Sequence, residues 1–348
     1  MGNIESLIKC LEPSKLRLNE PMSAHTTLGI GGAADLFYST ESSGDLVKAV
    51  RLSKTFQVPV TVIGGGSNLL VGDRGVRGLV IKNKSRKIIV HKEGKIHSFI
   101  RSVVGARWKA SAKGSIKYDF ADLDYDEKNC HDVEVVLDSG VNLQVAMVEL
   151  FGQGVTGLQW YARIPGTVGG AVYNNIHGGT HTFAEIVKKV VVLNEHGGIR
   201  TIQGRELKMG YDKSRFHENK EIILEVTLVL KSGDTERARK VADEWRKRKM
   251  IQPMNSAGCV FKNISEEDRA VLGYPTTSVG YIVENVINMS GYKVGGAAIS
   301  KEHHNFIVNT GKATARDFLA VRDEIVRRAR EGVGIELEDE IIRVGEFD

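Results

Sequence analysis

Two glycine-rich segments limit what this chain can fold into more than any other feature of its 348 residues. The first, residues 64–68 (Gly-Gly-Gly-Ser-Asn), follows the apolar run 58–63, which is typical of a short β-strand. A helix beginning at Ser42 or Ser43 precedes that run, so the region predicts a strand–helix–strand unit whose glycine turn can cradle a ligand. Bare glycine lets backbone N–H groups approach a phosphate. The alternative is a simple turn, because Leu69 breaks the dinucleotide-binding fingerprint.

The second segment, residues 164–171, reads Ile-Pro-Gly-Thr-Val-Gly-Gly-Ala. Taken alone it also has a simple turn as its alternative. Two such segments in one chain suggest that a single ligand is held from both sides. The candidate ligand-binding residues are Gly64, Gly65, Gly66, Ser67, Asn68, Ile164, Pro165, Gly166, Thr167, Gly169 and Gly170.

Charge and composition exclude several classes of protein. The net charge of +5 fits an anionic ligand, and the sequence has neither a basic tail nor an aromatic–basic groove pattern, so we expect no nucleic acid partner. The three cysteines are too far apart for a disulfide framework or a zinc site, which makes a reducing cytoplasm the default compartment. No signal-peptide core and no apolar run of about 18 residues occur, so we expect no membrane span.

Hydrophobic periodicity predicts the remaining elements. Residues 92–132 have little periodicity and are interpreted as an insertion or long surface loop. The expected elements are an N-terminal amphipathic helix, a strand at 133–137, a helix capped by Asn142, a hairpin around 194–198, a strand at 222–230, a basic helix at 235–250, a helix at 315–330 and a final strand at 335–344.

Cys259 is the side chain outside the glycine segments with the clearest chemical potential. If residues 255–263 form a strand, Cys259 and Phe261 share a face, and small neighbours leave the thiol accessible to a substrate. The alternative is a buried structural cysteine.

Three charged groups each have a functional and a structural interpretation. The run 246–249 (Arg-Lys-Arg-Lys) suits a diphosphate clamp or a solvated helix end. Glu336, Glu338 and Glu340 share one face of the expected last strand and could all face water, although one of them could turn into a site. His303-His304 has no acidic or cysteine partner at ligand spacing, so we expect no metal there.

Taken in order, these motifs resemble signatures of the UDP-N-acetylenolpyruvoylglucosamine reductase (MurB) family. Each motif is moderately specific, whereas the ordered set, which spans about residues 20 to 347, is strong. The matching segments are 25–32, 62–70, 163–171, 257–263, 295–297, 304–309 and 337–340.

The resemblance implies an α+β fold: a two-subdomain FAD-binding fold of the vanillyl-alcohol-oxidase (PCMH) type and a C-terminal α+β substrate domain. The implied division is an N-terminal helix (1–17), subdomain 1 (18–91), subdomain 2 (92–234, with the insertion at 92–132) and the substrate domain (235–348). It further implies a monomeric, cytoplasmic enzyme that uses NADPH and FAD to reduce the enolpyruvyl ether of a UDP-sugar for peptidoglycan precursor synthesis. The alternatives are an oxidoreductase of the same fold with another substrate and a non-catalytic flavin-binding protein.

The resemblance also assigns residues. Cys259 stands where the family has a proton-donating serine, and Glu340 falls on its final catalytic glutamate. A thiol, with an ordinary pKa near about 8.5, is a stronger acid than an alcohol, so the exchange is chemically sensible. Lys249 matches the lysine near the diphosphate. The implied substrate-binding residues are Tyr211, Lys249, Lys262 and Asn263.

Two segments depart from the family pattern. Asp212 replaces the catalytic arginine of a Tyr-Arg-x-Ser-x-Phe segment, and residues 175–180 (Asn-Ile-His-Gly-Gly-Thr) replace an Asn-Ala-Gly-Ala-Tyr-Gly loop. Since an anionic intermediate needs a cation, Arg215, three residues later, is the first candidate and Lys213 the second.

Overall fold

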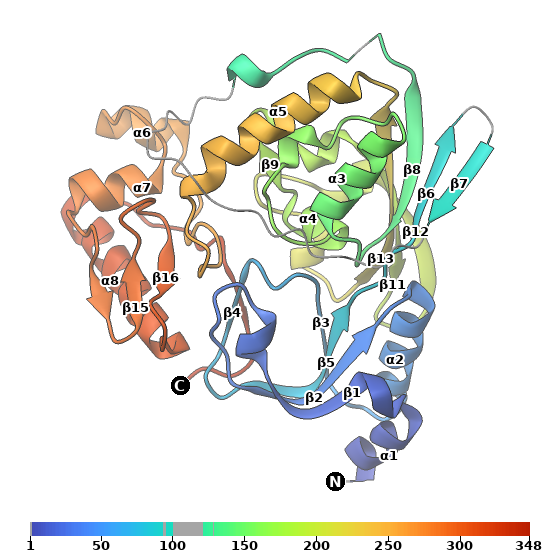
Figure 1. Cartoon of the computed structure of the whole chain (residues 1–348). Coiled ribbons are helices and arrows are strands. Elements are labelled where there is room, and N and C mark those ends of the chain that lie inside the picture. Colours follow the sequence, from blue (N-terminus) through green and yellow to red (C-terminus); the bar gives the residue numbers. More distant parts are fainter. Residues whose placement is uncertain (1, 93–94, 100–120, 128) are drawn as a thin grey trace. The chain divides into compact units, whose positions relative to one another are not determined.

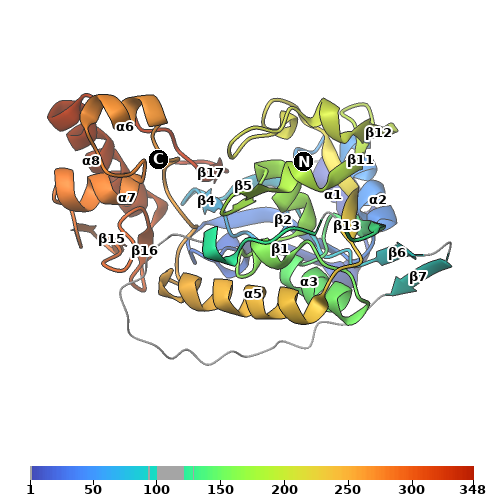
Figure 2. The same cartoon turned by 90° about the horizontal axis from the view of Figure 1, so that it is seen from above.

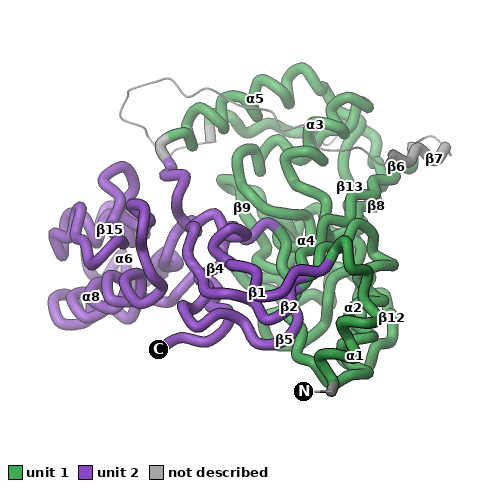
Figure 3. The backbone as a smooth tube through the Cα atoms, turned by 60° about the horizontal axis from the view of Figure 1, so that its bottom comes forward, with its two compact units in different colours: residues 1–15, 38–64, 81–250 green, residues 16–37, 65–80, 251–348 purple. Residues whose placement is uncertain are grey.

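The computed structural model describes residues 2–92, 95–99, 121–127 and 129–348 (Figure 1). The chain divides into two compact units, each assembled from separate stretches (Figure 3). Unit 1 comprises residues 1–15, 38–64 and 81–250, and unit 2 comprises residues 16–37, 65–80 and 251–348.

A six-stranded sheet of order β12-β11-β13-β8-β6-β7 forms the framework of unit 1, and its pairs are antiparallel. Alternating apolar residues on its strands bury one face, as in Val133, Val135 and Leu137 of β8. The strands are β6 (Ile88–Lys92), β7 (Lys95–Phe99), β8 (Asp132–Asp138), β11 (Val187–Leu193), β12 (Ile199–Gln203) and β13 (Ile222–Lys231).

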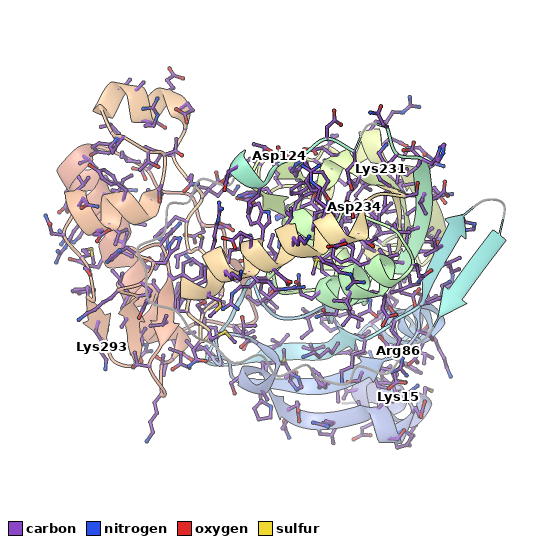
Figure 4. All side chains as sticks on the ribbon, turned by 45° about the horizontal axis from the view of Figure 1, so that its top comes forward. Lys15, Arg86, Asp124, Lys231, Asp234 and Lys293 are labelled. Atoms are coloured by element: carbon purple, nitrogen blue, oxygen red, sulfur yellow. The ribbon has the colours of Figure 1, made fainter. Side chains whose placement is uncertain are left out.

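Helices α3 (Leu143–Gly152), α4 (Val168–Asn174) and α5 (Thr235–Arg248) lie on one side of this sheet (Figures 1 and 2). Polar side chains begin all three: Asn142 accepts from two backbone N–H groups of α3, Thr167 from one of α4 and Asp234 from two of α5. Figure 4 shows Asp234 at the start of α5. The buried residues of α5 recur at helical spacing and join the core of unit 1: Ala238, Val241, Ala242 and Trp245.

A four-stranded sheet has the order β1-β2-β5-β3. Its strands are β1 (Leu16–Pro21), β2 (Ala33–Thr40), β5 (Val76–Asn83) and β3 (Val60–Ile63), and the chain passes from one unit to the other within β2 and β5. Unit 1 also contains α1 (Gly2–Cys10) and α2 (Ser43–Thr55), the second of which is capped by Ser42.

The longest helix, α8 (Ala315–Val333), organises the C-terminal part of unit 2. Its buried face packs with short antiparallel strands β14, β15 and β16, and β17 pairs in parallel with β4. The other elements are β4 (Leu69–Val71), α6 (Glu266–Leu272), α7 (Val279–Tyr281), a π-helical turn at Ile282–Val286, β14 (Lys293–Val294), β15 (Ala297–Ile299), β16 (Ile307–Asn309) and β17 (Ile342–Val344).

Most expected elements are confirmed: the N-terminal helix, the helices capped by Ser42 and Asn142, the hairpin, the basic helix and the helix at 315–330. The final strand was predicted too long, since only Ile342–Val344 forms it. Residues 335–341 form no regular strand, but Ile335 and Leu337 are buried and Glu336 and Glu338 are exposed, so the alternation there is correct although the strand is not.

Two further segments differ in detail from the sequence-based interpretation. Residues 255–263 form no regular strand, because Gly258 has φ 85° and breaks the alternation, so the consecutive residues Val260 and Phe261 are both buried. The interval 92–132 is not wholly a loop, because β7 pairs with β6. Residues 93–94, 100–120 and 128 of that interval lie outside the described part of the chain.

The proposed three-part division after the N-terminal helix stays a prediction. α5, which was expected to open the C-terminal domain, has its buried side chains in the core of unit 1. In the described ranges, no helix is both long and apolar enough to cross a membrane.

Candidate functional site

Within unit 1, the first residue of the first glycine-rich segment, Gly64, approaches the second segment. Gly64 directly follows β3, and a Cβ placed on it would lie 2.5 Å from the Thr167 hydroxyl oxygen and 3.2 Å from the Thr167 methyl carbon. No side chain fits at position 64 unless Thr167 moves. Glycine at this position therefore allows the two segments to lie against each other.

Gln144 of α3 fixes the entry to the second segment. Its side-chain amide donates to the Tyr161 and Ile164 carbonyls, both at 3.0 Å, and its oxygen accepts from the Arg163 N–H at 2.8 Å. Arg163 has φ 64°, an uncommon backbone conformation for a residue with a side chain. Its Nε donates to the Lys249 carbonyl at 2.9 Å, and burial lowers the pKa of the guanidinium below its ordinary value.

The glycines at the start of α4 have different surroundings. The Gly169 N–H donates to the Ser139 carbonyl at 2.8 Å, and a Cβ at Gly169 would lie 2.8 Å from the Ser139 Cβ. At Gly170 an added Cβ would contact only the Thr167 hydroxyl, at 3.6 Å. Gly169 is therefore required by packing within the protein, whereas Gly170 has space beside it for a ligand. The second segment, with this space and its small side chains, fits a flavin dinucleotide.

Three predicted segments meet in unit 2. The Thr27 N–H donates to the Gly66 carbonyl at 3.1 Å, and the Thr27 hydroxyl donates to the Ser256 carbonyl at 2.7 Å. Gly66 has φ 70°, and a Cβ on it would lie 2.1 Å from the His25 carbonyl oxygen. The glycine is therefore needed for a close approach of two backbones, which joins the beginning of the chain, the first glycine segment and the cysteine segment.

Backbone pairing brings Cys259 and Glu340 to neighbouring positions. The Glu340 N–H donates to the Val260 carbonyl at 2.8 Å, and the Asn68 side-chain amide donates to the Glu340 carbonyl at 3.1 Å. Cys259 itself is half-buried. These contacts place the predicted proton donor, the predicted glutamate and one residue of the first glycine segment in a single corner of unit 2.

Asn305 holds this corner together. Its side-chain oxygen accepts from the Phe261 N–H at 3.1 Å, its amide donates to the Phe261 carbonyl at 2.8 Å, and its own carbonyl accepts from the Val260 N–H at 2.8 Å. Asn305 is almost fully buried. It was not singled out as a functional residue, although it stands within a matching segment.

The predicted substrate-binding lysines both have protein contacts. The Lys262 ammonium pairs with the Glu338 carboxylate, and the Lys249 ammonium lies 4.7 Å from the centre of the Trp245 ring. Asn263, beside Lys262, is exposed. The remaining cations of the basic run face carboxylates: Arg246 with Asp243, Lys247 with Glu244, and Arg248 with Asp122 and Glu244.

The segment that departs from the family pattern is arranged around a left-handed residue. Asp212 has φ 47° and is buried, while its neighbour Tyr211 is 52% exposed. The Lys213 ammonium lies 2.8 Å from the Glu218 carboxylate. Arg215, in a short 3₁₀ turn, pairs with Glu221 at 3.1 Å and donates to the Glu206 carbonyl at 3.3 Å. Both predicted cations therefore already have a carboxylate partner.

The described residues contain no group of three or more histidine, cysteine or acidic side chains that could hold a metal ion. His303 and His304 instead contact neighbouring side chains: His304 lies between Ser290, at 2.8 Å, and Glu284, at 3.3 Å.

Comparison with known proteins identifies two matching family models. Residues 251–344 match the model described as UDP-N-acetylenolpyruvoylglucosamine reductase, C-terminal domain, and residues 34–121 match an FAD binding domain. Together the two matches include residues of both compact units.

Curated relatives match over almost the whole chain. The UDP-N-acetylenolpyruvoylglucosamine reductase of Caldanaerobacter subterraneus subsp. tengcongensis is 31% identical over 99% of this chain and 98% of its own. That of Heliobacterium modesticaldum is 33% identical over 94% of this chain and 90% of its own. The crystal structure of the Thermus caldophilus enzyme superposes with a TM-score of 0.65, at 29% identity, over 95% of this chain and 98% of that one.

Proposed function

Because the chain belongs to the UDP-N-acetylenolpyruvoylglucosamine reductase family, we propose that it reduces the enolpyruvyl ether of a UDP-linked N-acetylglucosamine to UDP-N-acetylmuramate. It is an FAD-dependent oxidoreductase that uses NADPH. The observation that carries the proposal is the match to curated relatives from one end of the chain to the other, which includes both the FAD-binding and the C-terminal models.

The reaction adds a hydride and a proton across one carbon–carbon double bond while NADPH becomes NADP⁺. When bound, FAD would supply the hydride that the methylene carbon of the substrate receives. Negative charge then develops beside the substrate carboxylate until a proton is added to the carbon that bears it. The protein must therefore supply a proton, a cation and a site that binds a diphosphate.

Cys259 is the proposed proton donor. Its half-buried position restricts water without sealing the thiol, and the clamp made by Asn305 gives its segment a fixed backbone. The Glu340 main chain is bonded to the residue after Cys259, so we propose that its carboxylate acts on the same carbon centre. Tyr211, Lys249, Lys262 and Asn263 are proposed to bind the UDP-sugar.

The two glycine-rich segments are proposed to hold FAD. Both segments offer backbone groups and small polar groups to a ligand. The proposed FAD-binding residues are Gly64, Gly65, Gly66, Ser67, Asn68, Ile164, Pro165, Gly166, Thr167, Gly169 and Gly170. The space beside Gly170 supports this assignment most directly.

The reaction also needs a cation beside the substrate carboxylate. Arg215 is the sequence-based candidate and Lys213 the second, but each contacts a carboxylate of its own segment or of the loop that follows. A cytoplasmic location and a monomeric state also stay predictions from the sequence.

A second candidate function is the reduction or oxidation of another substrate on the same flavin framework. The acidic Asp212 at a position expected to meet an anion favours it. Anaerobic reduction of the FAD-loaded protein by NADPH, followed by addition of the enolpyruvyl UDP-sugar, separates the two. Rapid reoxidation of the flavin is the expected result, and a flavin that NADPH reduces but the UDP-sugar does not reoxidise would leave only the second candidate.

A further inference from the structure

Two residues that depart from the family pattern, His177 and Asp212, are in contact with each other within unit 1. The His177 Nδ1 lies 3.3 Å from the Asp212 Oδ1. The His177 ring stacks on Tyr211, with ring centres 5.1 Å apart and planes inclined by 30°. Compared with the family pattern, His177 adds an imidazole and Asp212 replaces the guanidinium of an arginine, and these two side chains are in contact.

Asn175 holds the two segments in place. It ends α4 with φ 45°, and its side chain donates to the Gly210 carbonyl at 2.7 Å and accepts from the Ala184 N–H at 2.9 Å. His177 begins the short strand β9 (His177–Gly178), which pairs with β10 (His181–Thr182). The histidine and the aspartate are therefore presented by fixed backbones, at the end of the helix that the second glycine segment begins.

The charge of Asp212 requires a partner. Its side chain is only 8% exposed, and its Oδ2 is buried with no hydrogen-bond partner among the described residues. A buried carboxylate is costly unless a positive group offsets it, and His177 is the one ion-pair partner that the described residues provide. Lys213 and Arg215 pair with Glu218 and Glu221 instead.

The far side of the imidazole is available to a ligand. The His177 side chain is 37% exposed, and its Nε2 makes no hydrogen bond with the described residues. Because Nδ1 faces the Asp212 carboxylate, a protonated ring presents its other N–H donor, at Nε2, away from Asp212. The imidazole of His177 therefore has the buried Asp212 carboxylate on one side, and its protonated form presents the Nε2 N–H donor on the exposed side.

We propose that His177, oriented by Asp212, is the cation that binds the substrate carboxylate and stabilises the charge formed there during reduction. This inference rests on the proposed reductase function. The pair replaces a single arginine by two residues, with Asp212 as the positioning residue and His177 as the group that touches substrate.

The test uses the FAD-loaded protein and measures two quantities: the substrate dissociation constant, from the change in flavin absorbance, and the rate of flavin reoxidation by substrate. Replacement His177→Ala should slow reoxidation about 10²–10³-fold, the usual loss for one oriented donor. Flavin reduction by NADPH should stay unchanged. Added imidazole should restore part of the lost rate, because the half-exposed ring leaves an accessible space. Asp212→Asn should also slow reoxidation, without rescue by imidazole.

His181→Ala is the matched control. His181 also pairs with a carboxylate, Asp124 at 2.8 Å, and stacks on Trp160, but nothing places it in the site. It should keep wild-type reoxidation and show no response to imidazole. Wild-type reoxidation in His177→Ala, or an unaffected Asp212→Asn, overturns the inference alone. A wild-type protein that the substrate does not reoxidise overturns the proposed function and the inference together.

Discussion

The second glycine segment, from Arg163 to Ala171, and the segment from Gly210 to Phe216 belong to the same unit but are held by different interactions. Main-chain N–H groups and one glutamine side chain fix the first, and its Gly169 is required by a close contact with Ser139. Charged side chains dominate the second: Asp212 with His177, Lys213 with Glu218 and Arg215 with Glu221. The second glycine segment is therefore backbone-built, and substitutions in it disturb the fold. The segment from Gly210 to Phe216 is side-chain-built, so substitutions there can change its chemistry while the fold stays the same.

The largest expected effect is that of removing the Cys259 thiol, whose segment, like the second glycine segment, is held by main-chain contacts. Cys259→Ala should leave the fold and the reduction of FAD by NADPH intact, because main-chain and Asn305 contacts hold the segment. Reoxidation by the enolpyruvyl substrate should slow about 10²–10⁴-fold through loss of the proton donor. Stopped-flow absorbance of the flavin measures both half-reactions. Wild-type turnover in this variant would rule out Cys259 as the donor, and Cys130→Ala serves as the control.

The next effect separates two glycines within the backbone-built segment. Gly170→Leu should leave the melting temperature of the flavin-free protein near the wild-type value but prevent FAD retention, because its side chain would enter the space beside α4. Gly169→Leu should lower the melting temperature of the flavin-free protein itself, with a cost of at least about 1–3 kcal/mol from overpacking against Ser139. Thermal melts and flavin absorbance after gel filtration measure the two properties. A yellow Gly170→Leu protein would contradict the FAD assignment.

A smaller effect compares two ion pairs in the side-chain-built segment. Arg215→Ala leaves the buried Glu221 carboxylate with Arg200 and the Asn219 amide and should lower the free energy of unfolding by about 1–3 kcal/mol. Lys213→Ala breaks an exposed pair with Glu218 and should cost about 0–1 kcal/mol. Urea unfolding measures both. Equal costs would mean that Arg215 is not part of the structural network, and would return it to consideration as the catalytic cation.

The smallest expected effect is the contribution of His303 to the pH dependence of stability. Burial, and then the charge of His304, lower the pKa of His303 to about 4. The His303 Nδ1 accepts from the Asn305 N–H, so it must be unprotonated to do so. A histidine with a lowered pKa contributes stability above about pH 6.5, and this contribution is lost as pH falls towards 4. The free energy of unfolding should therefore fall as the pH is lowered through this window. His303→Asn should flatten that part of the pH profile; an unchanged slope would locate the titrating group elsewhere.

The sequence could predict what local patterns determine. The side chains of Ser42 and Asn142 begin their helices as expected, and Gly64 of the first glycine segment lies against Thr167 of the second. The length of the last strand was missed because alternation of apolar residues reports burial, and an extended segment without a full set of strand partners shows the same alternation.

The contacts that orient the site were not predictable in the same way. Gln144, Asn175 and Asn305 act on segments that lie close in space, and no local spacing specifies their partners. The left-handed conformation at Arg163 has no signal in its residue type, whereas asparagine and aspartate, as at Asn175 and Asp212, adopt this region more readily. The pairing of His177 with Asp212 had one available signal, namely that both positions depart from the family pattern.

The parallel pairing of β17 with β4 has a consequence for protein synthesis. β4 lies directly after the first glycine segment, and its partner, Ile342–Val344, is made almost at the end of the chain. All of residues 81–250 of unit 1 are made in between. Since domains fold as they leave the ribosome, unit 1 can form most of its six-stranded sheet before β17 is available to pair with β4. The corner that joins Asn68, Val260 and Glu340 can therefore close only after residues 81–250 of unit 1 have been made.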